Sequence, residues 1–309
     1  MYKLAFTLPI ALFIIVSCKK EDPPIEVEDI ASYTVAPNST DNDYESDEKE
    51  HYIFYNNESN VNKLLLFVGG TYSKPESYGT FCNHAAKLGC HVISISYPNN
   101  VAAASLKEST DLYAFDNYRD ELCFGNPVSD AVEIDELNCI VTRATKLLIH
   151  LSTQYPTQNW GQYLIDGNAP DWSKIIIAGH SQGSGHACYI AKSNVVNRVL
   201  MFSGPNDYST HFGAPGNWLS TVGVTPTSSQ YAFLHINDEV VPYERQLANI
   251  RAIGLISAVD STTLMDNLTG AYEDKNAFHT AIAAISEHGA TLGGNWRLPN
   301  FWTYLLGEN

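Results

Sequence analysis

A serine that could act as a nucleophile lies in the G-H-S-Q-G sequence of residues 179–183. The I-I-I run of residues 175–177 is typical of a buried parallel strand, and the small residues after the serine are typical of a helix packed closely on a sheet. Between a strand and a helix, G-x-S-x-G forms a sharp turn that exposes the serine hydroxyl. The flanking glycines leave room for the strained backbone of such a turn. We therefore predict that Ser181 is a catalytic nucleophile.

A serine hydroxyl is a poor nucleophile at neutral pH. It needs a histidine that takes its proton and a carboxylate that orients this histidine. The carboxylate is expected just beyond the second strand after the serine turn, where Asp238 lies in the sequence H-I-N-D-E-V-V-P. Asp207, in G-P-N-D, follows the preceding strand and is the alternative, with Glu239 as a third choice. Asp238 is therefore the predicted acid.

The chain has ten histidines, and most of them are expected to be structural. His279 follows the predicted acid and lies in a predicted loop ahead of a helix, so it is the predicted general base. His288 is the alternative, although the glycine after it is typical of a helix C-terminus, where a cation suits the helix dipole. His180 and His186 are close to Ser181 in the sequence, and either could line the site without transferring protons.

The negative charge that develops on a carbonyl oxygen during acyl transfer needs preorganised N–H donors. One donor is expected to be the backbone amide of Gln182, directly after the nucleophile. The second is expected from the G-G-T segment of residues 69–71, where the Thr71 amide is preferred and that of Gly70 is the alternative. An ordinary glycine turn is the other interpretation of this segment.

Strands and helices alternate along the chain, which is typical of an α/β domain with a mostly parallel sheet. The first predicted crossover consists of strand Lys63–Val68, helix Pro75–Lys87 and strand His91–Tyr97. An amphipathic helix is predicted from Ile134, another helix after the serine turn and another from Pro242. Further strands are predicted at Tyr52–Tyr55, Arg198–Ser203 and Tyr231–Ile236.

Two long segments are expected to cover the site, because loops at strand ends are the usual place for substrate selection. Residues 98–128 have no clear periodicity and are predicted to be a long loop, and residues 204–230 form a second excursion. Tyr208, Phe212 and Trp218 in the second segment suggest a partly apolar pocket for an acyl or aromatic group, although such residues more often belong to the core.

The acidic balance of the 309 residues limits the classes of partner. With 34 acidic and 18 basic residues the formal charge is −16, which argues against nucleic acid or an anionic membrane surface as the main partner. The sequence has no C-x-x-C or His/Cys spacing that suggests a metal site, and no G-x-x-x-x-G-K motif. Of the six cysteines, five follow the leader, and the sequence leaves their pairing open.

Residues 1–17 resemble a signal peptide, with a lysine followed by an apolar stretch too short to span a bilayer. The I-V-S-C sequence that ends at Cys18 resembles a lipobox, which predicts cleavage before Cys18 and acylation of its sulfur. Residues 18–50 are predicted to be an acidic tether, and residues 51–309 a single domain. The lysines after Cys18 favour anchoring to the outer membrane, on its periplasmic or its surface face. A plain secretory leader with a coincidental cysteine is the alternative.

Several short motifs resemble a little-characterised group of bacterial α/β-hydrolase-like proteins, which are often secreted. The motifs are G-T-x-x-x-P from Gly70, Y-P-N from Tyr97, W-x-x-Y-L from Trp160, W-x-x-I from Trp172 and A-G-H-S-Q-G-x-G-H-A from Ala178. The likeness covers about residues 60–290; Gly69 stands where proline is usual and Ser184 where a third glycine is common. The resemblance implies an α/β-hydrolase fold, with helices on both faces of the sheet, and a serine-hydrolase site without a settled substrate.

These features together predict a lipid-anchored serine hydrolase that cleaves carboxylic esters, with amides as the alternative bond, through an acyl-Ser181 intermediate. The substrate is expected to be a small-molecule or lipid ester, and the chemistry requires no cofactor or metal. An acyltransferase or a peptidase could use the same residues, and a non-catalytic lipoprotein could retain the fold for binding alone.

Overall fold

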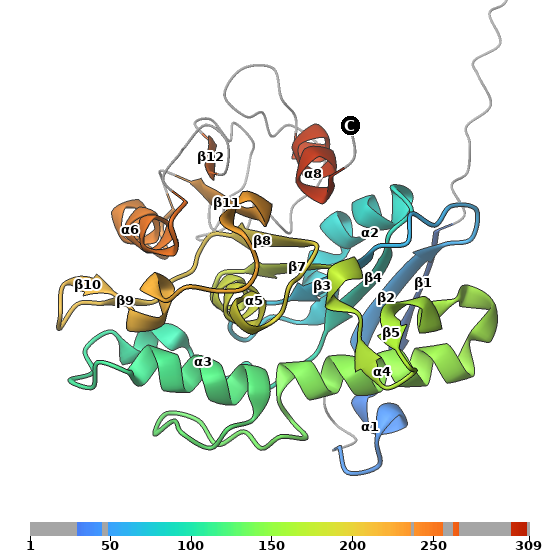
Figure 1. The fold of residues 1–309 in the computed structure, drawn as a ribbon, viewed down its shortest axis with the longest axis horizontal. Coiled ribbons are helices and arrows are strands. Elements are labelled where there is room, and N and C mark those ends of the chain that lie inside the picture. Colours follow the sequence, from blue (N-terminus) through green and yellow to red (C-terminus); the bar gives the residue numbers. More distant parts are fainter. Residues whose placement is uncertain (1–29, 45–48, 236–237, 256–261, 266–297, 308–309) are drawn as a thin grey trace, which may run out of the picture.

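The computed structural model describes residues 30–44, 49–235, 238–255, 262–265 and 298–307. Its centre is an eight-stranded sheet with the strand order β1-β2-β4-β3-β7-β8-β11-β12 (Figure 1). β2 runs antiparallel to both of its neighbours, and all the other neighbouring pairs in this sheet are parallel. The strands are β1 (Ile30–Val35), β2 (His51–Asn56), β3 (Leu64–Val68), β4 (His91–Ile95), β7 (Ile175–His180), β8 (Arg198–Phe202), β11 (Gln230–His235) and β12 (Thr262–Met265).

Helices cover both faces of this sheet (Figure 1). On one face lie α2 (Gly79–Lys87) and α8 (Leu298–Leu306), and the cluster on the other face includes residues of α3 (Ala114–Phe124), α4 (Ile140–Gln154), α5 (Gln182–Ser193) and α6 (Tyr243–Ile253). The strand order, the antiparallel second strand and the two helix layers are those of the α/β-hydrolase fold. The predicted fold class is therefore confirmed.

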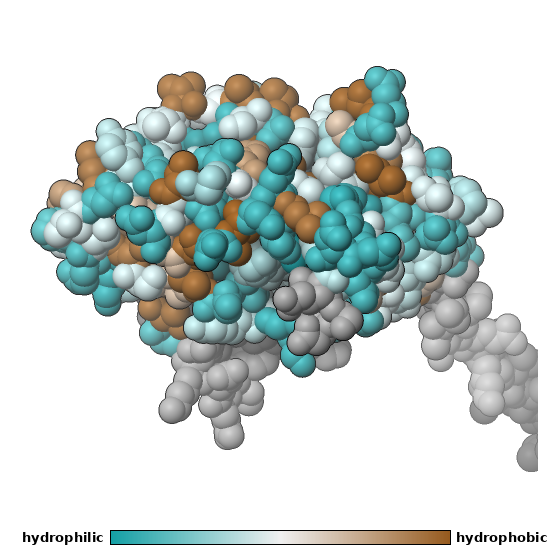
Figure 2. All heavy atoms as spheres, turned by 90° about the horizontal axis from the view of Figure 1, so that it is seen from below, coloured by the Kyte–Doolittle hydropathy of each residue, from teal (hydrophilic) through white to brown (hydrophobic). Residues whose placement is uncertain are grey.

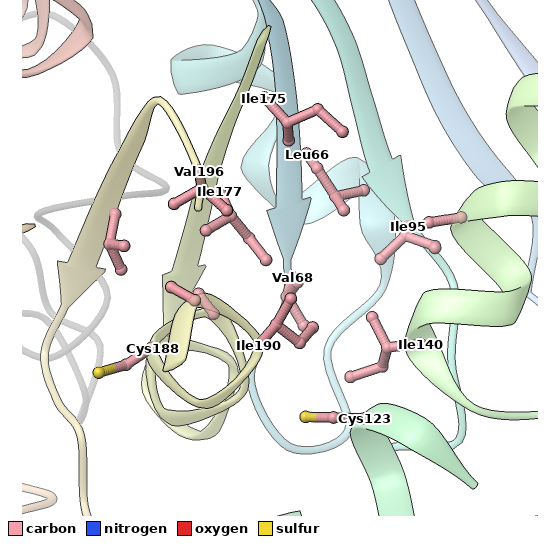
Figure 3. Close-up of a cluster of buried hydrophobic side chains, with 14 of the residues drawn as sticks. Leu66, Val68, Ile95, Cys123, Ile140, Ile175, Ile177, Cys188, Ile190 and Val196 are labelled. Atoms are coloured by element: carbon pink, nitrogen blue, oxygen red, sulfur yellow. The ribbon is translucent and has the colours of Figure 1, made fainter. Parts of the chain in front are cut away.

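The central strands are buried on both faces, because their alternate residues point into two separate apolar clusters. In β3, Leu64, Leu66 and Val68 belong to the cluster that includes α3, α4 and α5, whereas Leu65 and Phe67 belong to the cluster that includes α2 and α8. Figure 3 shows the first cluster, where side chains from the strands converge with those of the helices. A continuous apolar run such as that of β3 therefore indicates a strand with two buried faces.

The predicted strands are confirmed, and so are the helices after Pro75, after the serine turn and from Pro242. Apart from α3 and α4, the connections between them contain only short elements in the described residues. These are α1 (Pro37–Thr40), the small hairpins β5 (Leu164–Ile165) with β6 (Ala169–Pro170) and β9 (Tyr208–Ser209) with β10 (Ala214–Pro215), and 3₁₀-helices at Pro75–Tyr78, Ala103–Leu106, Pro156–Gln158, Trp160–Tyr163, Trp172–Lys174, Asn217–Ser220 and Thr227–Ser229.

The prediction that residues 98–128 form one long loop is wrong, because α3 lies within them. The buried face of α3 contains Phe115, Tyr118 and Leu122, which have ordinary helical spacing. The fully buried Arg119 interrupts this apolar pattern. A charged residue on the buried face thus hides the periodicity by which the helix would be recognised.

The helix predicted from Ile134 begins later, at Ile140. The preceding segment is held by Glu121, whose Oε2 accepts hydrogen bonds from the amides of Val128 and Ser129 at 2.9 and 2.8 Å. Its Oε1 accepts one from the Ile134 amide at 2.8 Å. The helix itself begins after Cys139, which has an extended backbone and whose Sγ accepts from the Thr142 amide at 3.5 Å as an N-cap.

The folded domain extends upstream of residue 51, the boundary expected from the sequence. β1 pairs with β2 along its whole length, from Ile30 opposite Asn56 to Val35 opposite His51. Part of the expected acidic tether is therefore the edge strand of the sheet. β1 has alternating apolar and polar residues, but the region around it is polar. For this reason the composition of the region suggested a tether.

The five cysteines after the leader are all buried thiols, and no disulfide joins them. Burial raises the pKa of the Cys123 thiol well above its usual value. Thiols in such surroundings are unreactive core residues. The pairing that the sequence left open is therefore absent from the structure; the cysteines are Cys82, Cys90, Cys123, Cys139 and Cys188.

The surface mixes polar and apolar residues. On the face shown in Figure 2, hydrophobic residues form small groups separated by hydrophilic ones. Across the described residues, no helix has both the length and the apolar character needed to cross a bilayer.

Candidate active site

Ser181 lies at a strained turn between β7 and α5. Its backbone has φ 54° and ψ −119°, a conformation that residues other than glycine rarely adopt. The Ser181 amide donates to the carbonyl of Phe202 in β8 at 2.8 Å, which ties the turn to the neighbouring strand. This strand, turn and helix geometry is the one predicted for the G-x-S-x-G sequence.

Glycine is required on both sides of the serine because backbone segments approach there closely. A Cβ atom added to Gly179 would lie 2.1 Å from the carbonyl oxygen of Gly183. One added to Gly183 would lie 2.0 Å from the carbonyl oxygen of Val68. Contacts this short do not occur between non-bonded atoms, so neither position can hold a larger residue without moving the backbone.

The loop after β3 packs directly against the serine. A Cβ atom on Gly70 would lie 3.3 Å from the Cβ of Ser181. The Thr71 hydroxyl donates to Gln182 Oε1 at 2.8 Å, and the amide of Ala103 donates to the same oxygen at 3.0 Å. The side chain of Gln182 therefore connects the serine turn to two other segments that border the site.

Hydrogen bonds hold the carbonyl groups of this loop in place. The Tyr97 hydroxyl donates to the carbonyl of Gly69 at 2.7 Å, and Asn99 Nδ2 donates to the carbonyls of Gly70 and Ser73 at 2.8 and 3.0 Å. The ammonium group of Lys49 also donates to the Ser73 carbonyl, at 3.1 Å. The loop is thus fixed before any ligand binds.

The amides of the same loop differ in their bonding. The Gly70 amide donates to the hydroxyl of Tyr78 at 2.8 Å, and the Tyr72 amide to the carbonyl of Asn99 at 2.9 Å. Within the described residues, neither the Thr71 amide nor the Gln182 amide donates to an acceptor. These are the two amides predicted to bind an oxyanion, whereas the alternative donor, Gly70, already has a partner.

His180 lies beside the serine but is part of a buried network. Its Nδ1 is 3.1 Å from the hydroxyl of Tyr78, which in turn accepts from the Gly70 amide. Burial raises the pKa of Tyr78, so this phenol remains neutral. His180 therefore lines the site and supports the Gly70 loop.

Asp238 lies in the loop that follows β11. Its Oδ1 accepts from the amides of Val240 and Val241, both at 2.9 Å, and its Oδ2 accepts from Gln246 Nε2 at 2.9 Å. These bonds fix the direction of the carboxylate. Val240 and Val241 line the same cleft as Ser181, whereas the third choice, Glu239, is exposed.

Asp207, the alternative acid, is engaged elsewhere. Its side chain is fully buried, and its two oxygens accept from Arg119 Nη2 at 2.6 Å and Nε at 2.9 Å. The indole of Trp218 donates to Oδ2 at 2.7 Å. Burial alone would lower the pKa of Arg119, but the Asp207 carboxylate raises it, so the guanidinium stays charged. Asp207 is thus a structural carboxylate.

The expectation that His186 could line the site is wrong. His186 is fully buried on α5, with its Nδ1 3.5 Å from the Cys123 thiol and the rings of Tyr97 and Tyr118 beside it. Burial, and then the nearby Arg119 charge, lower its pKa well below the usual value. The predicted base His279, its alternative His288 and the predicted lipidation site Cys18 lie outside the described residues.

A cleft of about 390 Å³ opens beside Ser181. The alanines 102–104 and Asn206 contribute to its lining, so both expected covering segments reach it. Tyr208, Phe212 and Trp218 do not line it; Trp218 is buried beside Asp207, and Phe212 is exposed. The apolar pocket suggested by these aromatic residues is therefore not formed by them. The lining also includes Gly70, Thr71, Tyr72, Ser73, Tyr78, His180, Gln182, Val240 and Val241.

Asn206 is a site residue that the sequence analysis missed. Its Nδ2 lies 3.2 Å from Ser181 Oγ. It follows the carboxyl end of β8, the strand next to β7, and polar residues at that sheet edge are placed near a serine turn. That position could have identified it. In the part of the chain that the structure describes, no group of His, Cys, Asp and Glu is arranged to hold a metal.

No protein-family model and no curated protein matches the chain. The crystal structure of TT1662 from Thermus thermophilus is similar, with 12% sequence identity, a TM-score of 0.45 and coverage of 91% of this chain and 99% of that chain. The fold assignment rests on the strand order and the helix layers, not on this likeness.

Proposed function

We propose that this protein is a serine hydrolase that cleaves carboxylic esters through an acyl-Ser181 intermediate. The main support for this proposal is that a serine with a strained backbone and two backbone amides without an acceptor lie at the same cleft. Ser181, Thr71 and Gln182 all line this cleft, and the Thr71 and Gln182 amides have no acceptor within the described residues. Such amides can bind the oxygen of a tetrahedral intermediate.

In the proposed reaction, Ser181 Oγ attacks the ester carbonyl and its proton passes to the imidazole of His279. Asp238 orients this imidazole, and the alcohol leaves with the proton that the imidazole returns. Water then attacks the acyl-serine by the same route. The bonds that Asp238 accepts from Val240, Val241 and Gln246 support its role, because they hold the carboxylate in one orientation.

The cleft favours an ester with an apolar acyl group of modest size. Its volume of about 390 Å³ is at the small end of ligand sites. Ala102, Ala103 and Ala104 form one part of the lining, and Val240 and Val241 another. Small aliphatic side chains leave room for an acyl chain and offer it apolar contact.

Fluorophosphonate labelling followed by peptide mapping tests the proposal. The reagent phosphonylates an activated serine, so label is expected on the peptide that contains Ser181. None is expected in Ser181→Ala, which should retain its melting temperature. Folded protein without label, or with label elsewhere, would favour a binding function.

A panel of p-nitrophenyl esters of graded acyl length measures the substrate range. The rate should fall at low pH as the general base becomes protonated. His279→Ala should abolish turnover, whereas His288→Ala should retain it. An unchanged pH–rate profile in His279→Ala would refute the assignment of the base.

We further propose that Cys18 is lipidated and anchors the domain to the outer membrane. Two or more acyl chains give stable attachment, whereas one is marginal. Cys18→Ala should shift the protein from the membrane fraction to the soluble fraction and abolish incorporation of labelled fatty acid. Fatty-acid labelling of the variant would contradict the assignment.

A further inference from the structure

Asn206 contacts the reacting oxygen of the proposed nucleophile. Its side-chain amide nitrogen is 3.2 Å from Ser181 Oγ, and both residues line the cleft. The Oδ1 atom of Asn206 is buried and has no hydrogen-bond partner in the described part of the chain. Because the amide nitrogen faces Ser181 Oγ, the side chain meets the serine as a hydrogen-bond donor.

The residues on both sides of Asn206 are anchored. The buried Asn249 on α6 donates from Nδ2 to the carbonyl of Pro205 at 2.9 Å. On the other side, Asp207 accepts two hydrogen bonds from the buried guanidinium of Arg119. Because both neighbours are fixed by buried polar groups, the backbone at Asn206 has little freedom to move away from Ser181.

Close packing also fixes this segment on the serine turn. A Cβ atom added to Gly204 would lie 2.1 Å from Ser184 Oγ, 2.9 Å from the Ser181 carbonyl and 3.2 Å from Asn206 Oδ1. The Ser184 hydroxyl in turn donates to the Ser181 carbonyl at 2.5 Å. Glycine at position 204 lets the chain pass close enough for Asn206 to reach the serine.

We infer that Asn206 is a further catalytic residue, which donates a hydrogen bond to Ser181 Oγ while this oxygen carries developing negative charge. This inference rests on the proposed hydrolase function. A hydrogen bond to the charged form of a group favours that form, so the donor assists loss of the serine proton. Arg119 and Asp207 are positioning residues, because neither lines the cleft: Asp207 adjoins Asn206 in the chain, and Arg119 binds both Asp207 and the Gln182 carbonyl.

The same donor serves both halves of the reaction. During acylation the Oγ–carbon bond forms as the serine proton moves to the general base, and the carbonyl electron pair moves to the carbonyl oxygen. This pair then returns as the ester bond to the alcohol oxygen breaks, and the alcohol leaves with the proton of the imidazolium. During deacylation the imidazole takes a proton from a water whose oxygen bonds to the acyl carbon. The Oγ–carbon bond then breaks with its electron pair on Oγ, Oγ regains a proton from the imidazolium, and the carboxylic acid is released. Asn206 keeps its own proton throughout and stabilises Oγ each time charge develops on it.

The test compares Asn206→Ala and Asn206→Asp with the wild type in the rate of fluorophosphonate labelling. A hydrogen bond to a charged group corresponds to about a 10- to 100-fold effect on rate, so Asn206→Ala should label that much more slowly. Asn206→Asp keeps the shape but places a negative charge beside Oγ, and it should label more slowly still. Asn168, an exposed residue in the β5–β6 turn, provides matched controls, because Asn168→Ala and Asn168→Asp should label at the wild-type rate.

Further readouts separate a catalytic role from a structural one. In ester hydrolysis, Asn206→Ala should lower kcat with little change in KM, and the melting temperature should remain within a few degrees of the wild type. If Asn206→Ala does not fold, the labelling rate of the isosteric Asn206→Asp is compared with that of the wild type instead. Wild-type labelling rates in folded Asn206→Ala, or faster labelling in the aspartate variant than in the alanine variant, would overturn the inference and leave the hydrolase function intact. A wild type that does not label at all would overturn both.

Discussion

Arg119 and Asp207 form an ion pair in which both side chains have no solvent exposure, with Nη2 2.6 Å from Oδ1 and Nε 2.9 Å from Oδ2. The third nitrogen, Nη1, donates to the backbone carbonyl of Gln182 at 2.7 Å. Gly185 makes room for the guanidinium, since a Cβ atom there would lie 2.3 Å from Nη2. One buried cation thus joins α3, the loop after β8 and the first turn of α5.

Removing Arg119 alone should destabilise the fold more than neutralising both members of this pair. Arg119→Met leaves a buried carboxylate without its cation, and breaking such a pair costs about 3–5 kcal/mol of the free energy of unfolding. In the double variant Arg119→Met with Asp207→Asn no buried charge remains, so part of that loss should be recovered. Urea denaturation of the variants measures the coupling; a double variant less stable than Arg119→Met would contradict this account.

Alanine at position 183 should disrupt the serine turn. The new Cβ would lie 2.0 Å from the Val68 carbonyl, so α5 must move away from β3, at a cost of at least about 2 kcal/mol of the free energy of unfolding. Fluorophosphonate labelling of Gly183→Ala should be lost together with this stability. Gly161→Ala is the matched control, because its Cβ would make an ordinary contact of 3.8 Å with Ser152; equal stability of the two variants would refute the prediction.

The hydroxyl of Thr71 should contribute to the rate by holding the loop after β3. Thr71→Val removes the hydrogen bond to Gln182 Oε1, which is worth about 1 kcal/mol, and kcat/KM should fall about fivefold. Thr71→Ser retains the hydroxyl and should stay close to the wild type. Ester hydrolysis by the two variants provides the measurement. A serine variant as slow as the valine variant would show that the methyl group matters, not the hydrogen bond.

Acid should destabilise the fold through His51. Burial, and then the charges of Arg143 and His150, lower the pKa of His51 from 6.5 to about 3. Between these two pH values His51 binds a proton in the unfolded chain but not in the folded chain. The stability that the neutral, buried His51 contributes is therefore fully present above pH 6.5. It is lost as the pH falls towards 3, up to roughly 5 kcal/mol.

Replacing His51 should therefore flatten the dependence of stability on pH. The unfolding free energy of His51→Gln should change less between pH 6.5 and 4 than that of the wild type. Burial also lowers the pKa of His91 and His186, so a part of the slope should remain. The exposed His211 is the control, and an equal flattening in His211→Gln would count against the assignment.

The elements recognised in the sequence are those whose physical requirements are local. A strand buried on both faces needs a continuous apolar run, as in β3, and a serine at a positive φ between close backbones needs glycine beside it, as at residues 179 and 183. Both requirements are met by neighbouring residues, so they can be read from a short stretch of sequence. The central strands and the serine turn followed from such stretches, whereas the order of the strands in the sheet is given by the tertiary structure.

The features that were missed depend on pairs of residues far apart in the chain. Arg119 and Asp207 are 88 residues apart, and Arg119 is stable on the buried face of α3 only because folding brings Asp207 to it. The contact between Asn206 and Ser181 likewise arises because β8 lies next to β7. The position of a buried charge, or of an amide beside a nucleophile, is explained by a partner that is distant in the sequence. Only the tertiary structure brings that partner close.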